Sequence, residues 1–509
     1  MFNRASGVLL HISSLPGKFG IGTFGDEPVK FAQRLARMGC GAWQILPLGP
    51  TDSYNSPYAS MGAYAGNVFF IDPKGLYDEG LLTEDEVAEC VCENEYVAQY
   101  EHLKKTRVSV FRKAYARLDE KGQKELDAFI EENSFWLPDY ALFRAIGAAN
   151  SNIRWQDWDL PLKKREADAI KKASEEFSEE IRFNEFLQWK FYSQWFLLKK
   201  KVNALGVHII GDMPMYLASD SSDLWANPQL FELDENLDTA ARAGVPPDYF
   251  CEDGQLWGNP LYMWSEMEKD GYSWWISRLK FALKMYDAVR IDHFRAFSAY
   301  YSIPKGKSAR EGEWIKGPGM KLFSMLKKEC PNAAVIAEDL GDVDEDVKSL
   351  VKKCGFPGMR VMQFAFLSDT ENTHLPHNYE RNTVAYTGTH DNNTILGYLW
   401  EAGEIQRKKT LEYIDFSGDW GKGGNSSPVI RAMLRSLWQS VASIVIVPIQ
   451  DLCGFGSDTK MNRPGTAEGN WEFRVTNSAL DSIDTDYVKR LNEIYGRKIS
   501  PIIKKSVDF

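Results

Sequence analysis

The stretch Asp287-Ala-Val-Arg-Ile-Asp-His-Phe-Arg295 joins a short apolar run to an arginine, an aspartate and a histidine. Two later stretches repeat this pattern, Ala334-Val-Ile-Ala-Glu-Asp339 and Val384-Ala-Tyr-Thr-Gly-Thr-His-Asp391. Buried strands that end in clustered charge are typical of the catalytic rim of a (β/α)8 barrel, whose strands carry functional side chains at their C-terminal ends. Three strand-end carboxylates, Asp292, Glu338 and Asp391, are therefore predicted to point toward one place.

The rest of the chain supplies the other strands that such a barrel needs. Eight β-rich segments are predicted, at 7–11, 42–47, 207–213, 288–292, 334–339, 359–364, 384–389 and 443–450. Most are followed by loop signals and then by helical periodicity, which is the alternation of a parallel sheet. A doubly wound sheet is the alternative, but no G-x-G-x-x-G turn follows the first strand. We expect one α/β catalytic domain over residues 1–509, a (β/α)8 TIM barrel with helical and loop insertions on its C-terminal rim.

Two long segments between strands are predicted to be insertions. Residues 79–200 are rich in Lys and Glu and are expected to form a mainly helical subdomain, which includes a capping box at Thr83 and Glu86. Residues 213–264 are polar and aromatic and are expected to face the substrate. Within them, residues 244–259 are predicted to form a lid, because Pro246 and Pro247 stiffen one end and the glycines near the other end leave it free to move.

Composition excludes several classes of protein. The 509 residues are 44% hydrophobic and 26% charged, as in compact globular proteins. A net charge of −11 opposes a nucleic-acid partner, and no apolar run reaches the length of about 18 residues that a membrane helix needs. The seven cysteines are odd in number and scattered, which favours free thiols in a reducing compartment. We therefore expect a cytoplasmic protein.

Cleavage of a glycosidic bond requires at least two carboxyl groups, one on each side of the bond. Asp292 and Glu338 fit these roles, because Arg290 shares a strand face with Asp292 and can keep it ionised, while burial favours the protonated form of Glu338. Simple ion pairing of the strand-end acids is the structural alternative. His293, His390 and Asp391 lack the close spacing of a metal site, and no cofactor or metal is expected.

Aromatic residues make up 13% of the chain, including 16 tryptophans. Sugars pack their C–H faces on aromatic rings while their hydroxyl groups form hydrogen bonds, so a polar and aromatic groove suits an oligosaccharide. Most of these rings are expected in the core. Trp257 and Tyr54, which lie in polar loops, are predicted to be exposed near the rim.

Several sequence blocks resemble those of one family. Arg290-Ile-Asp-His-Phe-Arg295, Ala337-Glu-Asp-Leu-Gly341 and Thr389-His-Asp-Asn392 are similar to the conserved blocks of the 4-α-glucanotransferases, the amylomaltase or disproportionating-enzyme family (glycoside hydrolase family 77). Further blocks extend the resemblance from residue 4 to residue 474, among them Ser56-Pro-Tyr-Ala-Ser60, Gly244-Val-Pro-Pro-Asp-Tyr-Phe250 and Glu468-Gly-Asn-Trp471.

The resemblance implies a role for each candidate site residue. Asp292 would be the nucleophile, Glu338 the general acid/base, and Asp391 the carboxylate that holds sugar hydroxyls. The remaining residues would line the same subsite or hold the glucan chain: Arg290, Asp212, His293, His390, Ser56, Tyr58, Gln255, Trp257 and Asn462, with Tyr54 at an outer subsite. The expected reaction is retaining transfer of α-1,4-glucan segments between maltooligosaccharides or to glucose.

Two other functions remain open from the residues. An α-amylase-like hydrolase would use the same carboxylates on water, and a non-catalytic glucan-binding protein would use the acids only to bind hydroxyls. Products from maltotriose distinguish all three, because transfer gives a ladder of longer and shorter glucans, hydrolysis raises total reducing ends, and binding changes nothing.

Overall fold

The computed structural model describes residues 2–247, 252–499 and 502. Within them, eight parallel strands form one sheet in the order β10-β11-β12-β1-β2-β3-β6-β9. The sheet closes on itself between β9 and β10, where the Ala337 N–H donates to the Pro357 carbonyl at 2.9 Å. These strands are β1 (Ala5–Leu9), β2 (Ala42–Gln44), β3 (His208–Met213), β6 (Ala288–Ile291), β9 (Val335–Ala337), β10 (Gly358–Val361), β11 (Thr383–Tyr386) and β12 (Ile444–Pro448). Each overlaps a predicted β-segment, with ends that differ by up to three residues, so the barrel is confirmed.

The strands are buried on both faces, and their side chains alternate between two hydrophobic clusters. In β12, Ile444 and Ile446 belong to the barrel interior, whereas Val445 and Val447 pack against the surrounding helices. In β6, Ala288 faces inward and Val289 and Ile291 face outward. Because side chains alternate along a strand, Arg290 and the following Asp292 share the inward face. The strand period thus places charged groups at the mouth of an apolar barrel.

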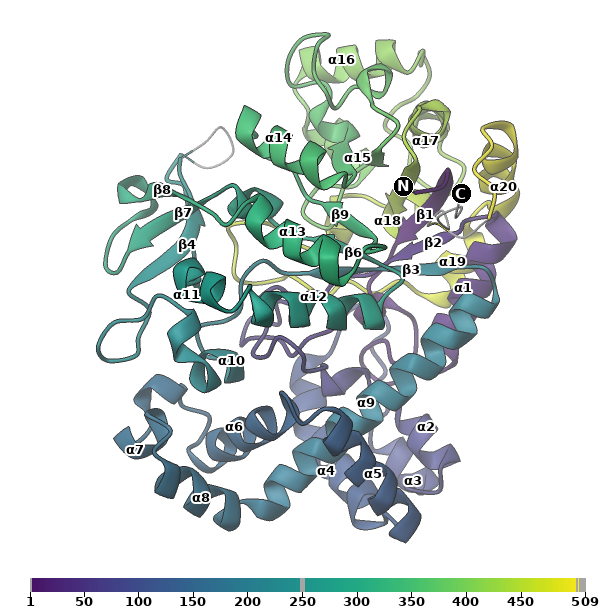
Figure 1. Ribbon diagram of the computed structural model, residues 1–509. Helices are drawn as coiled ribbons and strands as arrows, with labels where there is room; N and C mark the ends of the chain where they lie inside the picture. Colours follow the sequence, from purple (N-terminus) through teal and green to yellow (C-terminus); the bar gives the residue numbers. More distant parts are fainter. Residues whose placement is uncertain (1, 248–251, 500–501, 503–509) are drawn as a thin grey trace, which may run out of the picture.

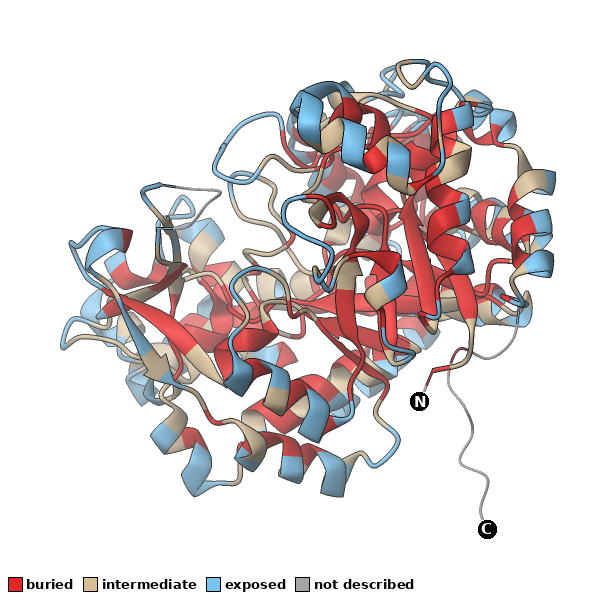
Figure 2. Cartoon of the chain, turned by 90° about the horizontal axis from the view of Figure 1, so that it is seen from above, coloured by how far each residue is buried: buried red, intermediate tan, exposed pale blue. Residues whose placement is uncertain are grey.

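Helices surround the barrel, as Figures 1 and 2 show, with their outer faces exposed and the strands buried. Those outside the segment between β2 and β3 are α1 (Asp26–Met38), α10 (Ser222–Ala226), α11 (Trp264–Lys269), α12 (Ser273–Met285), α13 (Met320–Glu329), α14 (Glu345–Cys354), α15 (Ile395–Glu401), α16 (Glu404–Tyr413), α17 (Pro428–Gln439), α18 (Ile449–Cys453), α19 (Asn477–Ser482) and α20 (Thr485–Ile494). Among the described residues, none of the helices combines the length and apolarity that crossing a membrane requires.

The segment between β2 and β3 is helical and extends from Pro73 to Ala204. It contains α2 (Pro73–Asp78), α3 (Glu84–Ala88), α4 (Tyr100–Ala116), α5 (Glu120–Glu132), α6 (Leu137–Ala149), α7 (Leu160–Lys163), α8 (Ala167–Glu176) and α9 (Ser178–Ala204). Thr83 and Glu86 cap α3 through the reciprocal side-chain bonds that the sequence predicts. The long helix α9 connects this helical lobe to the barrel (Figure 1). In α9, the Trp195 indole donates to the carbonyl of Met285, the last residue of α12, at 3.2 Å.

A second sheet was not anticipated by the sequence analysis. In the described part of the chain, β4 (Ala241–Val245), β5 (Gln255–Pro260), β7 (Ala299–Pro304) and β8 (Glu313–Lys316) form an antiparallel sheet in the order β5-β4-β7-β8. β4 and β5 pair with a register shift between Arg242 and Gly244, and β4 also pairs with β7, which is distant in sequence. Short strands with glycine, proline and a register shift lack the alternation that identifies a strand.

Gly211 in β3 illustrates how tightly the barrel is packed below the site. A Cβ atom at this position would lie 2.1 Å from the ring of the buried Tyr286. We expect Gly211→Ala to destabilise the protein by about 1–3 kcal/mol, the usual cost of overpacking a core. Thermal unfolding should show a clear fall in the midpoint. Gly403→Ala is the matched control, because no atom lies within 4 Å of the added methyl group; an equal effect of both substitutions would contradict this explanation.

Candidate active site

The four acidic residues of the site lie at or just after the C-terminal ends of four barrel strands. Asp212 is the second-to-last residue of β3, Asp292 directly follows β6, Glu338 directly follows β9, and Asp391 lies in the loop after β11. The last three line one cleft of about 630 Å³. This is the end of a (β/α)8 barrel at which catalytic residues gather.

Arg290 connects two of these carboxylates inside the barrel mouth. Its Nη1 donates to both carboxylate oxygens of Asp212, at 2.8 and 2.7 Å, and its Nη2 lies 2.9 Å from Oδ1 of Asp292. Its Nε lies 3.3 Å from the Met359 sulfur. Arg290 and Asp212 are each 3% exposed. The planar guanidinium can serve two carboxylates at once, which compensates the cost of burying its charge.

Glu338 is held by the backbone. Its Oε2 accepts the N–H of His293 at 2.7 Å, and its Oε1 accepts the N–H of Leu340 at 2.8 Å. His293 has φ 47°, in the left-handed region that non-glycine residues rarely adopt. This turn ends β6 and directs the His293 amide toward Glu338. Trp257 packs edge-on against the His293 ring, with the ring centroids 4.8 Å apart.

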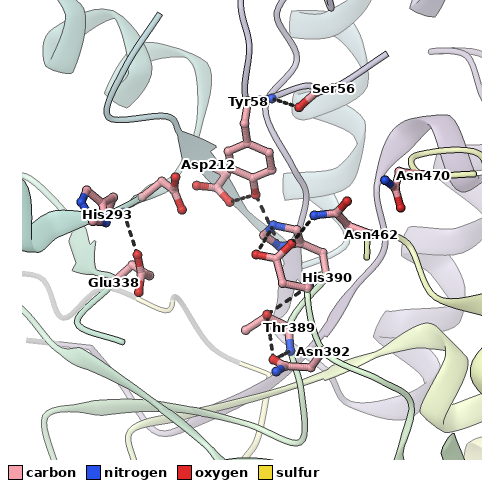
Figure 3. A network of polar contacts seen from close by, with 12 residues as sticks. Ser56, Tyr58, Asp212, His293, Glu338, Thr389, His390, Asn392, Asn462 and Asn470 are labelled. Carbon is pink, nitrogen blue, oxygen red and sulfur yellow. Dashed lines mark hydrogen bonds and ion pairs between the residues drawn. The ribbon is translucent and has the colours of Figure 1, made fainter. Parts of the chain in front are cut away.

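Asp391 is oriented by Asn462, which lies in another loop, and by its chain neighbour His390; both partners are labelled in Figure 3. Asn462 Nδ2 donates to Oδ1 of Asp391 at 2.6 Å, and Nε2 of His390 lies 3.3 Å from Oδ2. The ring of Tyr58 stacks on that of His390 at 4.9 Å, and its hydroxyl donates to Asp212 at 2.7 Å. Three loops therefore meet around Asp391, whose side chain is 42% exposed and faces the cleft.

Burial shapes the protonation of the site. It raises the pKa of the Asp292 carboxyl, while the adjacent Arg290 acts in the opposite direction. Burial also raises the pKa of Glu338, again against the effect of Arg290. The two carboxyls therefore hold a proton between them more firmly than isolated acids would. Because Arg290 contacts Asp292 directly, it favours the negative charge on Asp292 and the proton on Glu338.

The two histidines of the site are neutral at pH 7. Burial lowers the pKa of His293 to about 3, and burial also lowers the pKa of His390. They can therefore form hydrogen bonds without adding positive charge. Within the described residues, no group of three or more His, Cys, Asp and Glu side chains is arranged to hold a metal ion.

The structure brings the predicted site residues together. Eleven of them line the cleft: Tyr54, Ser56, Tyr58, Gln255, Trp257, Asp292, His293, Glu338, His390, Asp391 and Asn462. Arg290 and Asp212 lie beneath it and contact Asp292 and Tyr58. Trp257 and Tyr54 are exposed, as predicted, at 38% and 59%. Of the predicted lid over residues 244–259, positions 248–251, which include Tyr249 and Phe250, lie outside the described residues.

Several residues of the cleft were not predicted from the sequence. Asp52, Tyr216, Asn470 and Trp471 also line it. Oδ1 of Asp52 accepts the N–H groups of Tyr54 and Ser56, both at 3.0 Å, and so shapes the loop that carries them. The motif Glu468-Gly-Asn-Trp471 was a signal for the last two residues. Asp52 and Tyr216 stand in no motif that sequence reasoning singled out.

A (β/α)8 barrel with carboxylates around one buried arginine, at the base of an aromatic and polar cleft, defines an enzyme of the class that acts on glycosidic bonds. The family model described as 4-α-glucanotransferase matches residues 10–480. The chain is 42% identical over 492 residues to a 4-α-glucanotransferase of Clostridium butyricum, with 96% of this chain and 100% of that protein covered. It is also 42% identical over 476 residues to that of Thermus thermophilus, with 93% and 95% covered.

A solved structure agrees with these relatives. An amylomaltase from Streptococcus agalactiae, in complex with acarbose, matches with a TM-score of 0.94 at 39% identity, covering 97% of this chain and 100% of that one. The chain belongs to the 4-α-glucanotransferase family. The family resemblance, the fold and the expected activity of a 4-α-glucanotransferase are thereby confirmed, and a hydrolase or a non-catalytic binder is not favoured.

The contact between Arg290 and Asp212 leads to a prediction about pH. Burial contributes most to the raised pKa of Asp292, and the negative charge of Asp212 raises it further. In Asp212→Asn this charge is lost, so the pKa of Asp292 should fall and Asp292 should stay ionised to lower pH. The acid limb of the profile of kcat/KM against pH should therefore move to lower pH. An acid limb that stays in place or moves to higher pH would show that Asp212 does not influence this carboxyl.

Proposed function

We propose that the chain transfers α-1,4-glucan segments by a retaining mechanism in which Asp292 is the nucleophile and Glu338 is the general acid/base. The observation that carries this assignment is the contact of Arg290 with Asp292, combined with the half-buried position of Glu338 at the same cleft, which raises its pKa. An ionised nucleophile and a protonated acid are the two states that the first step requires.

In the first step, the Asp292 carboxylate attacks the anomeric carbon of the donor, and Glu338 gives its proton to the departing glycosidic oxygen. A glycosyl ester on Asp292 and a shortened glucan result. In the second step, the Glu338 carboxylate removes the proton from the 4-hydroxyl of an acceptor, whose oxygen attacks the anomeric carbon and releases Asp292. Two inversions restore the α configuration. The backbone N–H groups of His293 and Leu340 stabilise the Glu338 carboxylate between the steps.

The other residues of the cleft hold the sugar chain. Asp391 accepts hydrogen bonds from sugar hydroxyls at the subsite of cleavage, and its bonds to Asn462 and His390 fix its orientation. Arg290, Asp212 and His293 complete this subsite. The remaining proposed contacts to the glucan come from Ser56, Tyr58, Gln255 and Trp257, with Tyr54 at the outer edge. The Trp257 indole donates to Gln255 at 3.0 Å, which supports a joint role for these two.

Transfer requires that an acceptor outcompetes water at the glycosyl ester. We assign the exclusion of water to the segment 244–259, whose described parts include β5 with Gln255 and Trp257 at the cleft. Closure of such a segment would sequester the intermediate. The same proposal treats residues 1–509 as one catalytic domain, with a helical insertion at 79–200 and a substrate-facing insertion at 213–264.

A cytoplasmic location is also proposed. It is supported by the six cysteines that the structure describes, all of which are free, as is usual in a reducing compartment. The proposed binding partners are α-1,4-glucans and maltooligosaccharides; nucleic acid is disfavoured by the net charge of −11.

The assignment of Asp292 predicts that Asp292→Asn abolishes turnover of maltotriose and leaves the fold intact, because an amide cannot form the glycosyl ester. Circular dichroism and thermal unfolding provide the control for the fold. Asp344→Asn is a matched substitution, since Asp344 caps α14 away from the cleft, and it should keep nearly full activity. Activity of Asp292→Asn within about tenfold of wild type, a loss of only about 1.4 kcal/mol in barrier, would mean that another residue is the nucleophile.

A further inference from the structure

A second groove lies between the helical lobe and the barrel helix α12, apart from the active-site cleft. It consists of two adjoining cavities of about 540 and 360 Å³. The two cavities share four lining residues: Phe135, Asp270, Ser273 and Ser277. One wall comes from the junction of α5 and α6, and the opposite wall from α12, along its length from Ser273 to Lys284. Each volume lies within the range of about 300–1,000 Å³ that is typical of ligand sites.

An exposed aromatic ring stands at the centre of this groove. Phe135 is 56% exposed, although its ring contacts Tyr64 with centroids 5.1 Å apart and Phe281 with centroids 6.4 Å apart. Tyr64 and Phe281 also contact each other, at 5.3 Å. The three rings form a fixed platform, so little conformational entropy is lost when a ligand covers Phe135. Such a ring, open to solvent and rigidly supported, suits the C–H face of a sugar.

The charges of the groove point to a neutral ligand. Its two lysines are already paired, Lys280 with Glu329 at 2.8 Å and Lys284 with Glu132 at 2.7 Å. A phosphate or another anion would therefore have to break an existing ion pair. By contrast, the side-chain amides of Asn227 and Gln229 make no hydrogen bond to any residue that the structure describes, so they are available to hydroxyl groups.

The groove and the active-site cleft share their walls. The loop after β2 lines the cleft with residues 52–59 and the groove with residues 62–65. The segment after β3 lines the cleft with residues 214–216 and the groove with Ser222 and Asp223, the first two residues of α10. The two segments are bonded to each other between these parts, through Ala218 N–H to the Ser60 carbonyl at 3.0 Å and Ala63 N–H to Asp223 at 2.8 Å. A ligand in the groove would thus lie against the same rigid wall as a substrate in the cleft.

We propose that this groove is a second binding site for α-1,4-glucan, which holds one part of a long chain while another part occupies the active-site cleft. Phe135 supplies the stacking platform, and Asn227 and Gln229 supply hydrogen bonds to hydroxyl groups. The proposal rests on the glucan transfer activity of the chain. We therefore expect a preference for long substrates over maltotriose, because maltotriose is too short to occupy both sites.

The test compares Phe135→Ala with wild type on maltotriose and on amylose, in the full-length enzyme. The KM for amylose should rise about fivefold, as the loss of one aromatic platform implies, while kcat/KM for maltotriose stays within about twofold. Native electrophoresis in gels that contain amylose should show weaker retardation of the variant. Tyr77→Ala is the matched control, because Tyr77 is an exposed aromatic residue of the same helical lobe that does not line the groove.

Gln229→Ala provides a second variant, with an exposed side chain whose loss does not threaten the fold, and it should raise the KM for amylose about twofold. The proposal is wrong if both variants handle amylose like wild type, or if maltotriose and amylose activity fall together. A wild-type dimer that Phe135→Ala converts to a monomer would also overturn it, because the groove would then be an interface between copies. Absence of a product ladder from maltotriose with wild type would instead contradict glucan transfer itself.

Discussion

The site depends on one buried ion pair. Arg290 stands inside the barrel mouth with both oxygens of Asp212 on one side and Asp292 on the other. A guanidinium at this depth is tolerated only when its charge is compensated. Asp212 compensates the charge of Arg290, and Arg290 in turn favours the ionised form of Asp292. Tyr58 extends this chain of contacts, because its hydroxyl binds Asp212 and its ring stacks on His390. The contacts of Arg290 and Asp212 therefore influence both the protonation of the nucleophile and the position of the loop that carries Tyr58.

The barrel strands and the loops position different residues of the site. The strands fix the positions of Asp292 and Glu338 within a few bonds of the most rigid part of the molecule, as acid and nucleophile require. Asp391 instead lies in a loop and takes its orientation from Asn462 and His390. Backbone strain at His293, with φ 47°, aims an amide at Glu338 and so connects the end of β6 to the acid after β9. The remaining surfaces of the cleft come from loops and from β5, which lie outside the barrel strands.

Much of this arrangement could be predicted from the sequence. Buried parallel strands are continuous apolar runs, so all eight were found, and the charges that end three of them indicated the site. The contact of Arg290 with Asp292 follows from strand alternation alone. The contact of Arg290 with Asp212 could not be predicted in this way, because it depends on which strand lies beside β6 and on the register that places Asp212 of β3 opposite Arg290. The antiparallel sheet was missed for a similar reason: β4 pairs with β7 across a long stretch of sequence, and neither has a regular alternation.

The most direct test of this account is to identify the residue that carries the glycosyl group during transfer. In Glu338→Gln, an activated donor such as a maltosyl fluoride needs no acid to form the intermediate but has no base to resolve it. Peptide mass spectrometry after quenching should find the glycosyl group as an ester on Asp292. An adduct on Asp391 or another side chain would contradict the central claim that Arg290 maintains Asp292 as the nucleophile.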